Sequence, residues 1–191
     1  MTCIVGLVED GCVVLGGDAL TVDGWTCTVC KHAKVWKAGE WVCGVSGAPV
    51  IQQLMRYSFP WPELADDADP ARWLMAEGMR LVRTLLAEHG QIGRETTNNP
   101  QGMDMRDGGM LIGVRGRLFA IGSTFQVIEA EDDYDAIGGG AQVARGALYA
   151  LRQHIKWPRL PAAQQVLSAL EAAARFNASV SAPFTLVATE G

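Results

Sequence analysis

The sequence lacks any uninterrupted apolar run that approaches the roughly 20 residues of a membrane-spanning helix. It also lacks the start of a secretory signal peptide, because residues 1–16 hold no basic stretch and Glu9 and Asp10 interrupt their apolar positions. Charged residues make up only 19% of the chain, its net charge is −5, and no cluster of Lys and Arg stands out. Because nucleic-acid phosphates are bound by clustered basic residues, we expect no nucleic-acid partner. From the missing apolar run and signal peptide we expect a cytoplasmic protein without a membrane partner.

Histidines and cysteines are also scarce at the spacings that metal sites use. The cysteines, odd in number and confined to the first quarter of the chain, fit reduced thiols better than a disulfide framework. They are Cys3, Cys12, Cys27, Cys30 and Cys43. Cys27 and Cys30 form a lone C-x-x-C, which we interpret as strand or turn residues because no second pair follows at zinc spacing. We therefore expect no metal site.

What the sequence does contain is a series of clear strand and helix signals. The turn Asp10-Gly11 between two β-branched runs predicts a hairpin, and Ala38-Gly39-Glu40 predicts a second one. Predicted strands cover 2–8, 12–15, 34–36, 41–45, 110–114, 118–121, 126–129 and 183–189. Predicted helices, from apolar residues at helical spacing, cover 48–57, 70–89, 141–154 and 160–174.

The order of these elements indicates the fold class. Strands and helices come in blocks, without β-α-β alternation, which favours an α+β architecture over a parallel sheet. Two antiparallel sheets between two helix layers, a four-layer α-β-β-α sandwich, would satisfy this order. Residues 90–109 are expected to form a flexible loop, and the apolar segment 59–62 is compatible with an interface.

Thr2 is the first candidate for chemistry. A small residue after the initiator methionine normally allows Met1 to be removed, so Thr2 would carry both a hydroxyl and a free α-amine. Such an amine titrates near ~7.7–8.0 and can act as a general base close to neutral pH. A threonine hydroxyl is a weak nucleophile without such a base. Many proteins begin with Met-Thr, so an incidental second residue is an open alternative.

Asp18 and Lys34 add a candidate charge pair. Asp18 follows Gly16-Gly17 at the end of a predicted strand, and Lys34 lies inside an apolar run. A lysine on a half-buried strand is costly unless it is paired, and Asp18 is a natural partner. An ammonium near Thr2 would favour a deprotonated hydroxyl and a neutral amine. From these residues alone, a turn cap at Asp18 and an outward-facing Lys34 are equally open.

Several short segments match a known pattern in order and spacing. They are Thr2–Val8, Gly16-Gly17-Asp18, Ala33-Lys34-Val35, Gly109-Met110-Leu111-Ile112, Glu131-Asp132-Asp133 and Ala136-Ile137-Gly138. Together they resemble the bacterial HslV-type peptidase and proteasome β-subunits, and the end of the chain from Arg175 resembles a phage and bacterial branch of that family. Residues 58–108 match poorly.

This resemblance implies a single N-terminal-nucleophile (Ntn) hydrolase domain over residues 1–191. It places the family's nucleophile at Thr2, its aspartate at Asp18 and its lysine at Lys34. The segment Gly44-Val45-Ser46-Gly47 resembles the corner that supplies the oxyanion donor, which would be the N–H of Gly47. The free N–H groups of a helix N-terminus agree with that role.

The same resemblance implies a threonine-type endopeptidase that needs no cofactor or metal. Its subunits would form a ring-type homo-oligomer acting on peptides or unfolded proteins, and an ATPase unfoldase is allowed as a further partner. Two positions depart from the pattern: Gly139 stands where the family has a serine, and Asn177 stands where it has an aspartate. The serine that follows that aspartate would fall on Ser179 or Val180. These departures leave open a small-amide acylase or an inactive proteasome-like shell or binding protein.

Other candidates are weaker. Gly138-Gly139-Gly140 before a helix could suggest phosphate binding, but the Lys-Thr ending of a P-loop is missing. Cys3 could be proposed as a nucleophile, yet removal of Met1 would expose Thr2 instead.

Overall fold

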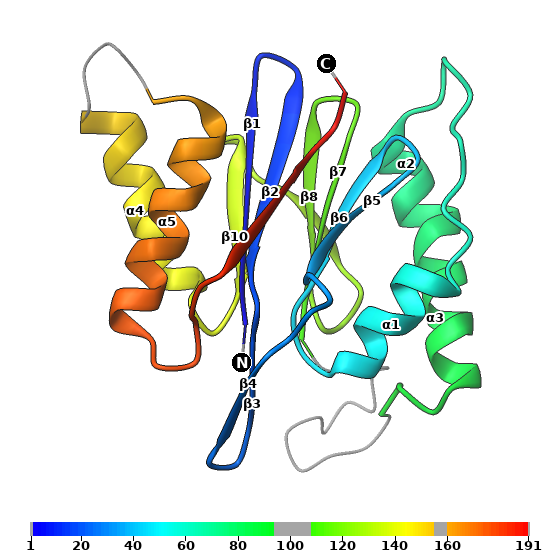
Figure 1. The fold of residues 1–191 in the computed structure, drawn as a ribbon. Coiled ribbons are helices and arrows are strands. Elements are labelled where there is room, and N and C mark those ends of the chain that lie inside the picture. Colours follow the sequence, from blue (N-terminus) through cyan, green and yellow to red (C-terminus); the bar gives the residue numbers. More distant parts are fainter. Residues whose placement is uncertain (1, 94–107, 155–159, 191) are drawn as a thin grey trace.

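The structure is a computed structural model that describes residues 2–93, 108–154 and 160–190 (Figure 1). Its strands are β1 (Cys3–Glu9), β2 (Cys12–Asp18), β3 (Leu20–Asp23), β4 (Thr26–Val29), β5 (Val35–Ala38), β6 (Trp41–Val45), β7 (Met110–Val114), β8 (Arg117–Ile121), β9 (Val127–Glu129), β10 (Tyr134–Gly138) and β11 (Phe184–Ala188). Its helices are α1 (Pro49–Tyr57), α2 (Pro70–Trp73), the π-helical η1 (Leu74–Gly78), α3 (Met79–Glu88), α4 (Ala141–His154) and α5 (Ala162–Phe176).

Two antiparallel sheets face each other at the centre of the molecule. One sheet has the strand order β10-β1-β2-β11 and the other β5-β6-β7-β8-β9, while β3 and β4 pair as a separate hairpin. Helices α4 and α5 cover the outer face of the first sheet, and α1 and α3 cover the second (Figure 1). The predicted four-layer α-β-β-α sandwich is confirmed.

Buried apolar clusters fill the interfaces between these layers. Strand β1 shows the arrangement, because Cys3 and Val5 pack beneath α4 and α5 while Ile4 lies between the two sheets with Leu111. Both faces of β1 are therefore buried. This explains why its sequence is an almost continuous apolar run rather than the alternating pattern of a half-exposed strand.

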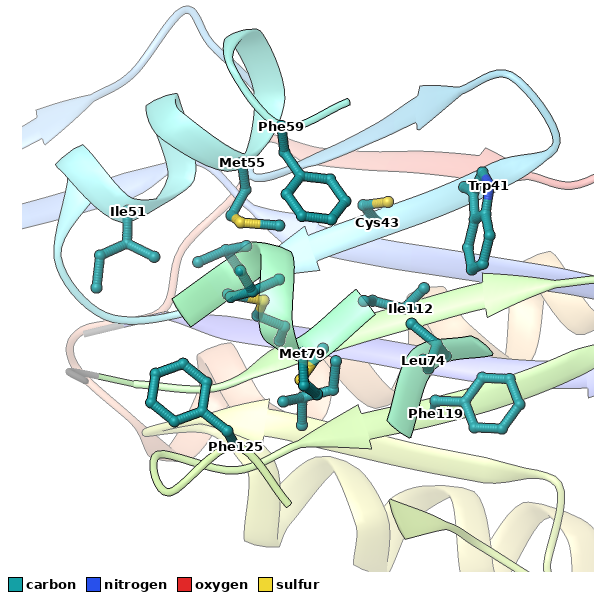
Figure 2. Packing of buried hydrophobic residues seen from close by; sticks show 14 of the residues in the cluster. Trp41, Cys43, Ile51, Met55, Phe59, Leu74, Met79, Ile112, Phe119 and Phe125 are labelled. Carbon is teal, nitrogen blue, oxygen red and sulfur yellow. The ribbon is translucent and has the colours of Figure 1, made fainter. Parts of the chain in front are cut away.

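The third cluster lies between the second sheet and its helices, as Figure 2 shows around Met55 and Phe59. The Phe59 and Trp61 rings are 4.7 Å apart, and Trp61 Nε1 donates a hydrogen bond of 2.9 Å to the Met55 carbonyl. Trp61 also packs against Trp41, at 5.6 Å between ring centroids. The aromatic rings of segment 59–62 thus pack inside this chain, and whether the segment also serves an interface stays a prediction.

Three local features differ from the sequence-based expectations. The hairpin β3–β4 was not predicted, because its mostly exposed residues show no buried face. Strand β10 was not among the predicted strands, yet it pairs with β1 along its whole length. The helix predicted over 70–89 is present but contains η1 in its middle. Most of the loop predicted over 90–109 lies outside the described residues.

In the described ranges, none of the helices combines the length and the apolar character needed to cross a bilayer.

Candidate active site

The fold brings Thr2, Asp18 and Lys34 to one end of the facing sheets. Thr2 lies directly before β1, and Asp18 ends β2, the antiparallel neighbour of β1. Lys34 lies directly before β5, in the other sheet. The three predicted residues therefore meet, although Lys34 is 32 positions from Thr2 in the sequence.

Lys34 contacts both other residues through its ammonium group. Its Nζ donates to Thr2 Oγ1 at 2.9 Å, to the two Asp18 carboxylate oxygens at 3.1 and 3.0 Å, and to the Leu20 carbonyl at 2.5 Å. An ammonium has three N–H groups, and these three partners occupy all of them. The positive charge is therefore held in a fixed orientation against the Thr2 hydroxyl oxygen.

Asp18 is fixed in turn by the backbone. Its Oδ1 accepts the Cys3 N–H at 2.9 Å, and its Oδ2 accepts the Leu20 N–H at 3.0 Å. Thr2, Asp18 and Lys34 are only 6%, 1% and 5% exposed. Buried charges are tolerated when they are paired and fully hydrogen-bonded. Asp18 therefore holds Lys34 in place and balances its charge.

Gly47 borders the same cavity as Thr2. This cavity of about 360 Å³ is also lined by Thr21, Lys34 and Gln52. Gly47 has φ +110° and lies just before the first turn of α1. Its N–H makes no hydrogen bond to any described residue. A free N–H beside a nucleophile can stabilise an oxyanion.

The backbone around Gly47 is clamped from the second sheet. The Ser46 N–H donates to the Gly109 carbonyl at 2.9 Å, and the Gly109 N–H donates to the Ser46 hydroxyl at 3.0 Å. Gly108 has φ +75°, and a Cβ there would lie 1.8 Å from the Ser46 carbonyl oxygen. Glycine is thus required at 108 for the chain to approach Ser46. This clamp was not predicted, and the adjacent Gly108-Gly109 was its only signal in the sequence.

A second glycine corner covers Thr2. Gly138 has φ +90°, and a Cβ there would lie 2.1 Å from the Thr2 carbonyl oxygen. The next residue, Gly139, accepts a 2.8 Å hydrogen bond from Asn177 Nδ2. Ser179 in turn donates its hydroxyl to Asn177 Oδ1 at 2.6 Å. The residues at the two departing positions therefore form their own network, which ties the end of α5 to the corner over Thr2.

Cys3 is placed as a structural residue. Burial and the nearby Asp18 carboxylate raise the pKa of the Cys3 thiol to about 12, although Lys34 acts in the opposite direction. Its side chain packs in the helix-facing core cluster. The nucleophilic form of cysteine is the thiolate, so Cys3 is a poor nucleophile at neutral pH.

The two histidines whose side chains the structure describes do not gather at the site. His32 borders a neighbouring cavity, and the His89 ring lies 2.9 Å from the Leu85 carbonyl oxygen on α3. Among the described residues, no group of three or more His, Cys, Asp and Glu side chains is arranged to hold a metal ion.

Comparison with known proteins supports the architecture. No protein-family model and no curated protein matches the sequence. Among solved structures, BPH from Thiobacillus denitrificans has a TM-score of 0.78 at 22% identity, covering 99% of this chain and 98% of that chain. HslV from Trypanosoma brucei has a TM-score of 0.68 at 16% identity, covering all of both chains. Anbu, an ancestral beta-subunit from Yersinia bercovieri, has a TM-score of 0.65 at 15% identity, covering 98% and 81%. The chain therefore has the fold of the proteasome-like Ntn hydrolases.

Proposed function

We propose that this chain is a threonine-type peptidase that uses Thr2, exposed by removal of Met1, as its nucleophile. The observation that carries the proposal is the buried hydrogen bond from Lys34 Nζ to Thr2 Oγ1, with Asp18 balancing the charge of Lys34. An ammonium that donates to the hydroxyl oxygen stabilises the negative charge that develops there during attack.

The base in this mechanism is the α-amine of Thr2. All N–H groups of Lys34 point at acceptors, so Lys34 acts as a fixed cation and the neutral amine takes the hydroxyl proton. Oγ1 then bonds to the carbonyl carbon, and the electron pair of the C=O bond moves to the oxygen. The Gly47 N–H donates to that oxyanion.

Collapse of this intermediate breaks the C–N bond, and the Thr2 ammonium returns its proton to the leaving nitrogen. The product is an ester between the substrate acyl group and Oγ1. Water then gives a proton to the same amine and attacks the ester carbon. The C–Oγ1 bond breaks, Oγ1 takes a proton, and the acid product leaves.

Two alternatives share the fold: a small-amide acylase and an inactive shell or binding protein. The cavity at Thr2 has a neighbouring cavity along α1 with which it shares lining residues, and this favours an extended substrate over a small amide. Asn177 donates a hydrogen bond to the Gly139 carbonyl, so the backbone beside Thr2 is held in place although the family's serine is absent. This favours an active enzyme over an inactive shell or binding protein. BPH has been solved in complex with epoxomicin, which makes that compound a suitable probe.

We also propose that the chain assembles as a ring-type homo-oligomer in the cytoplasm, with an ATPase unfoldase as a further partner. The hairpin β3–β4 supports assembly, because Trp25 at its turn is fully exposed and an isolated two-stranded hairpin is only marginally stable in water. In Figure 1 this hairpin projects away from the two sheets.

Parallel assays on one sample test the proposal. Electron imaging reports assembly, while hydrolysis of an unfolded protein and of a small N-acyl amide reports activity. We expect hydrolysis of the unfolded protein by the wild type and none by Thr2→Ala. Hydrolysis of the small amide alone would favour the acylase. Equal turnover by wild type and Thr2→Ala would exclude Thr2 as the nucleophile.

A further inference from the structure

A second cavity opens beside the one that contains Thr2. It has a volume of about 370 Å³ and runs along α1 to His32, Arg56 and Tyr57. Thr21, Lys34, Pro49 and Gln52 line both cavities, so the two share a wall next to the nucleophile. A substrate whose carbonyl carbon reaches Thr2 Oγ1 can therefore place an adjacent side chain in the second cavity.

Arg56 brings an unbalanced positive charge to this cavity. Its Nη1 donates to the Ala33 carbonyl at 2.9 Å, and its guanidinium carbon lies 5.5 Å from the centre of the Trp36 ring and 5.8 Å from that of Tyr57. No carboxylate of the described chain pairs with it. By contrast, Lys34 is paired with Asp18 and Arg115 with Glu40.

Most of the hydrogen-bonding capacity of Arg56 is not used by the residues that the structure describes. A guanidinium carries five N–H donors, of which one is committed to Ala33. The same carbonyl also accepts Gln52 Nε2 at 2.9 Å, so one turn of α1 presents two side chains that are fixed at Ala33. The stacked, tethered guanidinium is pre-oriented, which suits a planar, two-pronged contact with a carboxylate.

The two cavities differ in the charges that line them. Asp23 lines the cavity at Thr2 but does not line the second cavity. An acidic side chain would be repelled by Asp23 and attracted by Arg56. His32, at the second cavity, adds a further cation only when it is protonated.

We propose that the second cavity selects an acidic substrate side chain next to the reacting carbonyl, and that Arg56 is the residue that selects it. This inference rests on the proposed function, because it assumes that the carbonyl is attacked at Thr2. A helix-terminal cation that only tethers α1 to Ala33 is the alternative role for Arg56. The two roles differ in whether the charge of the substrate side chain affects its binding.

Binding to Thr2→Ala protein tests the selection without any turnover. The probes are fluorescein-labelled peptide amides that differ only in a last residue of Glu, Gln or Lys. We expect the Glu peptide to bind about 10- to 100-fold more tightly than the Gln peptide, the scale of a hydrogen-bonded charge pair. Arg56→Gln on this background should bring the ratio close to one, whereas Arg56→Lys should retain part of it. Arg80→Gln, at an exposed arginine on α3, is the matched control and should leave the ratio unchanged.

Turnover by the otherwise wild-type protein then separates the two proposals. A Glu-over-Gln preference in kcat/KM that Arg56→Gln removes supports both. Binding selectivity without hydrolysis of any peptide would overturn the peptidase proposal alone. Equal affinity for Glu and Gln peptides, or equal loss of the ratio in Arg56→Lys and Arg56→Gln, would overturn the role of Arg56 in charge selection.

Discussion

Lys34 Nζ lies 2.9 Å from Thr2 Oγ1, although the two residues come from different sheets of the sandwich. The contact is possible because β1 and β5 begin at the same end of the facing sheets, with Asp18 between them at the end of β2. The packing of the two sheets thus determines the geometry of the proposed chemistry.

Two substitutions of Thr2 test whether its hydroxyl is the reacting group. Thr2→Ser keeps the hydroxyl and the amine and should retain measurable peptide hydrolysis. Thr2→Ala removes the nucleophile and should lower kcat by at least ~10³-fold, as the loss of a nucleophile does in other hydrolases. Assembly, measured by mass photometry, should be the same in both variants. A Thr2→Ser protein as inactive as Thr2→Ala would count against the hydroxyl as the reacting group.

Removing Lys34 should affect both rate and stability. Lys34→Ala should lower kcat/KM by at least ~100-fold, the scale of one electrostatic group. It should also reduce the free energy of unfolding by roughly 3–5 kcal/mol, because the buried Asp18 carboxylate loses its partner. Denaturant unfolding and peptide kinetics measure the two effects.

The double variant Lys34→Met with Asp18→Asn distinguishes these effects. It removes both charges, so stability should recover relative to Lys34→Ala while activity stays low. Restored activity in the double variant would show that Lys34 serves the structure only.

Gly108→Ala should disturb the clamp at Ser46. The added Cβ would lie 1.8 Å from the Ser46 carbonyl oxygen at φ +75°, so residues 46–47 must shift. We expect a loss of at least ~1–3 kcal/mol of stability together with lower kcat. Gly39→Ala is the matched control, because φ there is +61° and nothing lies within 4 Å of the added Cβ. Equal effects of the two substitutions on kcat would contradict the clamp.

Cysteine alkylation tests the assignment of Cys3 as structural. Burial raises the pKa of the Cys3 thiol to about 12 and that of Cys43 well above its usual range. At a pH below its pKa a thiol is mostly protonated, and a raised pKa makes its thiolate fraction at pH 8 smaller. Cys3 and Cys43 should therefore resist iodoacetamide at pH 8. Exposed Cys27 should react first, and all cysteines should react in denaturant. Alkylation of Cys3 as fast as Cys27, read by peptide mass spectrometry, would make Cys3 a competing nucleophile.

Trp25→Ser tests the proposed role of the hairpin in assembly. An exposed tryptophan on a marginal hairpin gains the most by burial against another subunit. We expect the variant to dissociate at concentrations where the wild type remains assembled, as measured by analytical ultracentrifugation. An unchanged sedimentation coefficient would place the subunit contact elsewhere.

Much of the fold could be predicted from local patterns. The hairpin at Asp10-Gly11 and the helices from Pro49 and Ala141 follow from turn and capping signals and from apolar spacing. The hairpin β3–β4 was missed despite its Asp23-Gly24 turn, because Leu20 is its only buried residue and its strands show no alternation of buried and exposed side chains. Strand β10 was missed because a strand of only five residues that includes Asp135 carries little alternation.

The candidate site was predictable only in part. Thr2, Asp18 and Lys34 were found from a buried lysine that needs a partner and from the family resemblance. The contacts of Gly109 with Ser46 and of Asn177 with Gly139 link residues more than 35 positions apart. No local pattern encodes such pairs, because they depend on the pairing of β6 with β7 and on how α5 packs against the first sheet. Arg56 gave no signal either, since its proposed importance lies in having no carboxylate partner among the described residues.

The most direct test of the central claim is peptide mapping by mass spectrometry after treatment with epoxomicin, a peptide epoxyketone that requires a hydroxyl and a free amine on the same residue. The account predicts that Met1 is absent, that one inhibitor is added per chain, and that the adduct maps to Thr2. It also predicts a slower reaction in Lys34→Met. Folded protein that lacks Met1 and remains unmodified, or that carries the adduct at another residue, would contradict it.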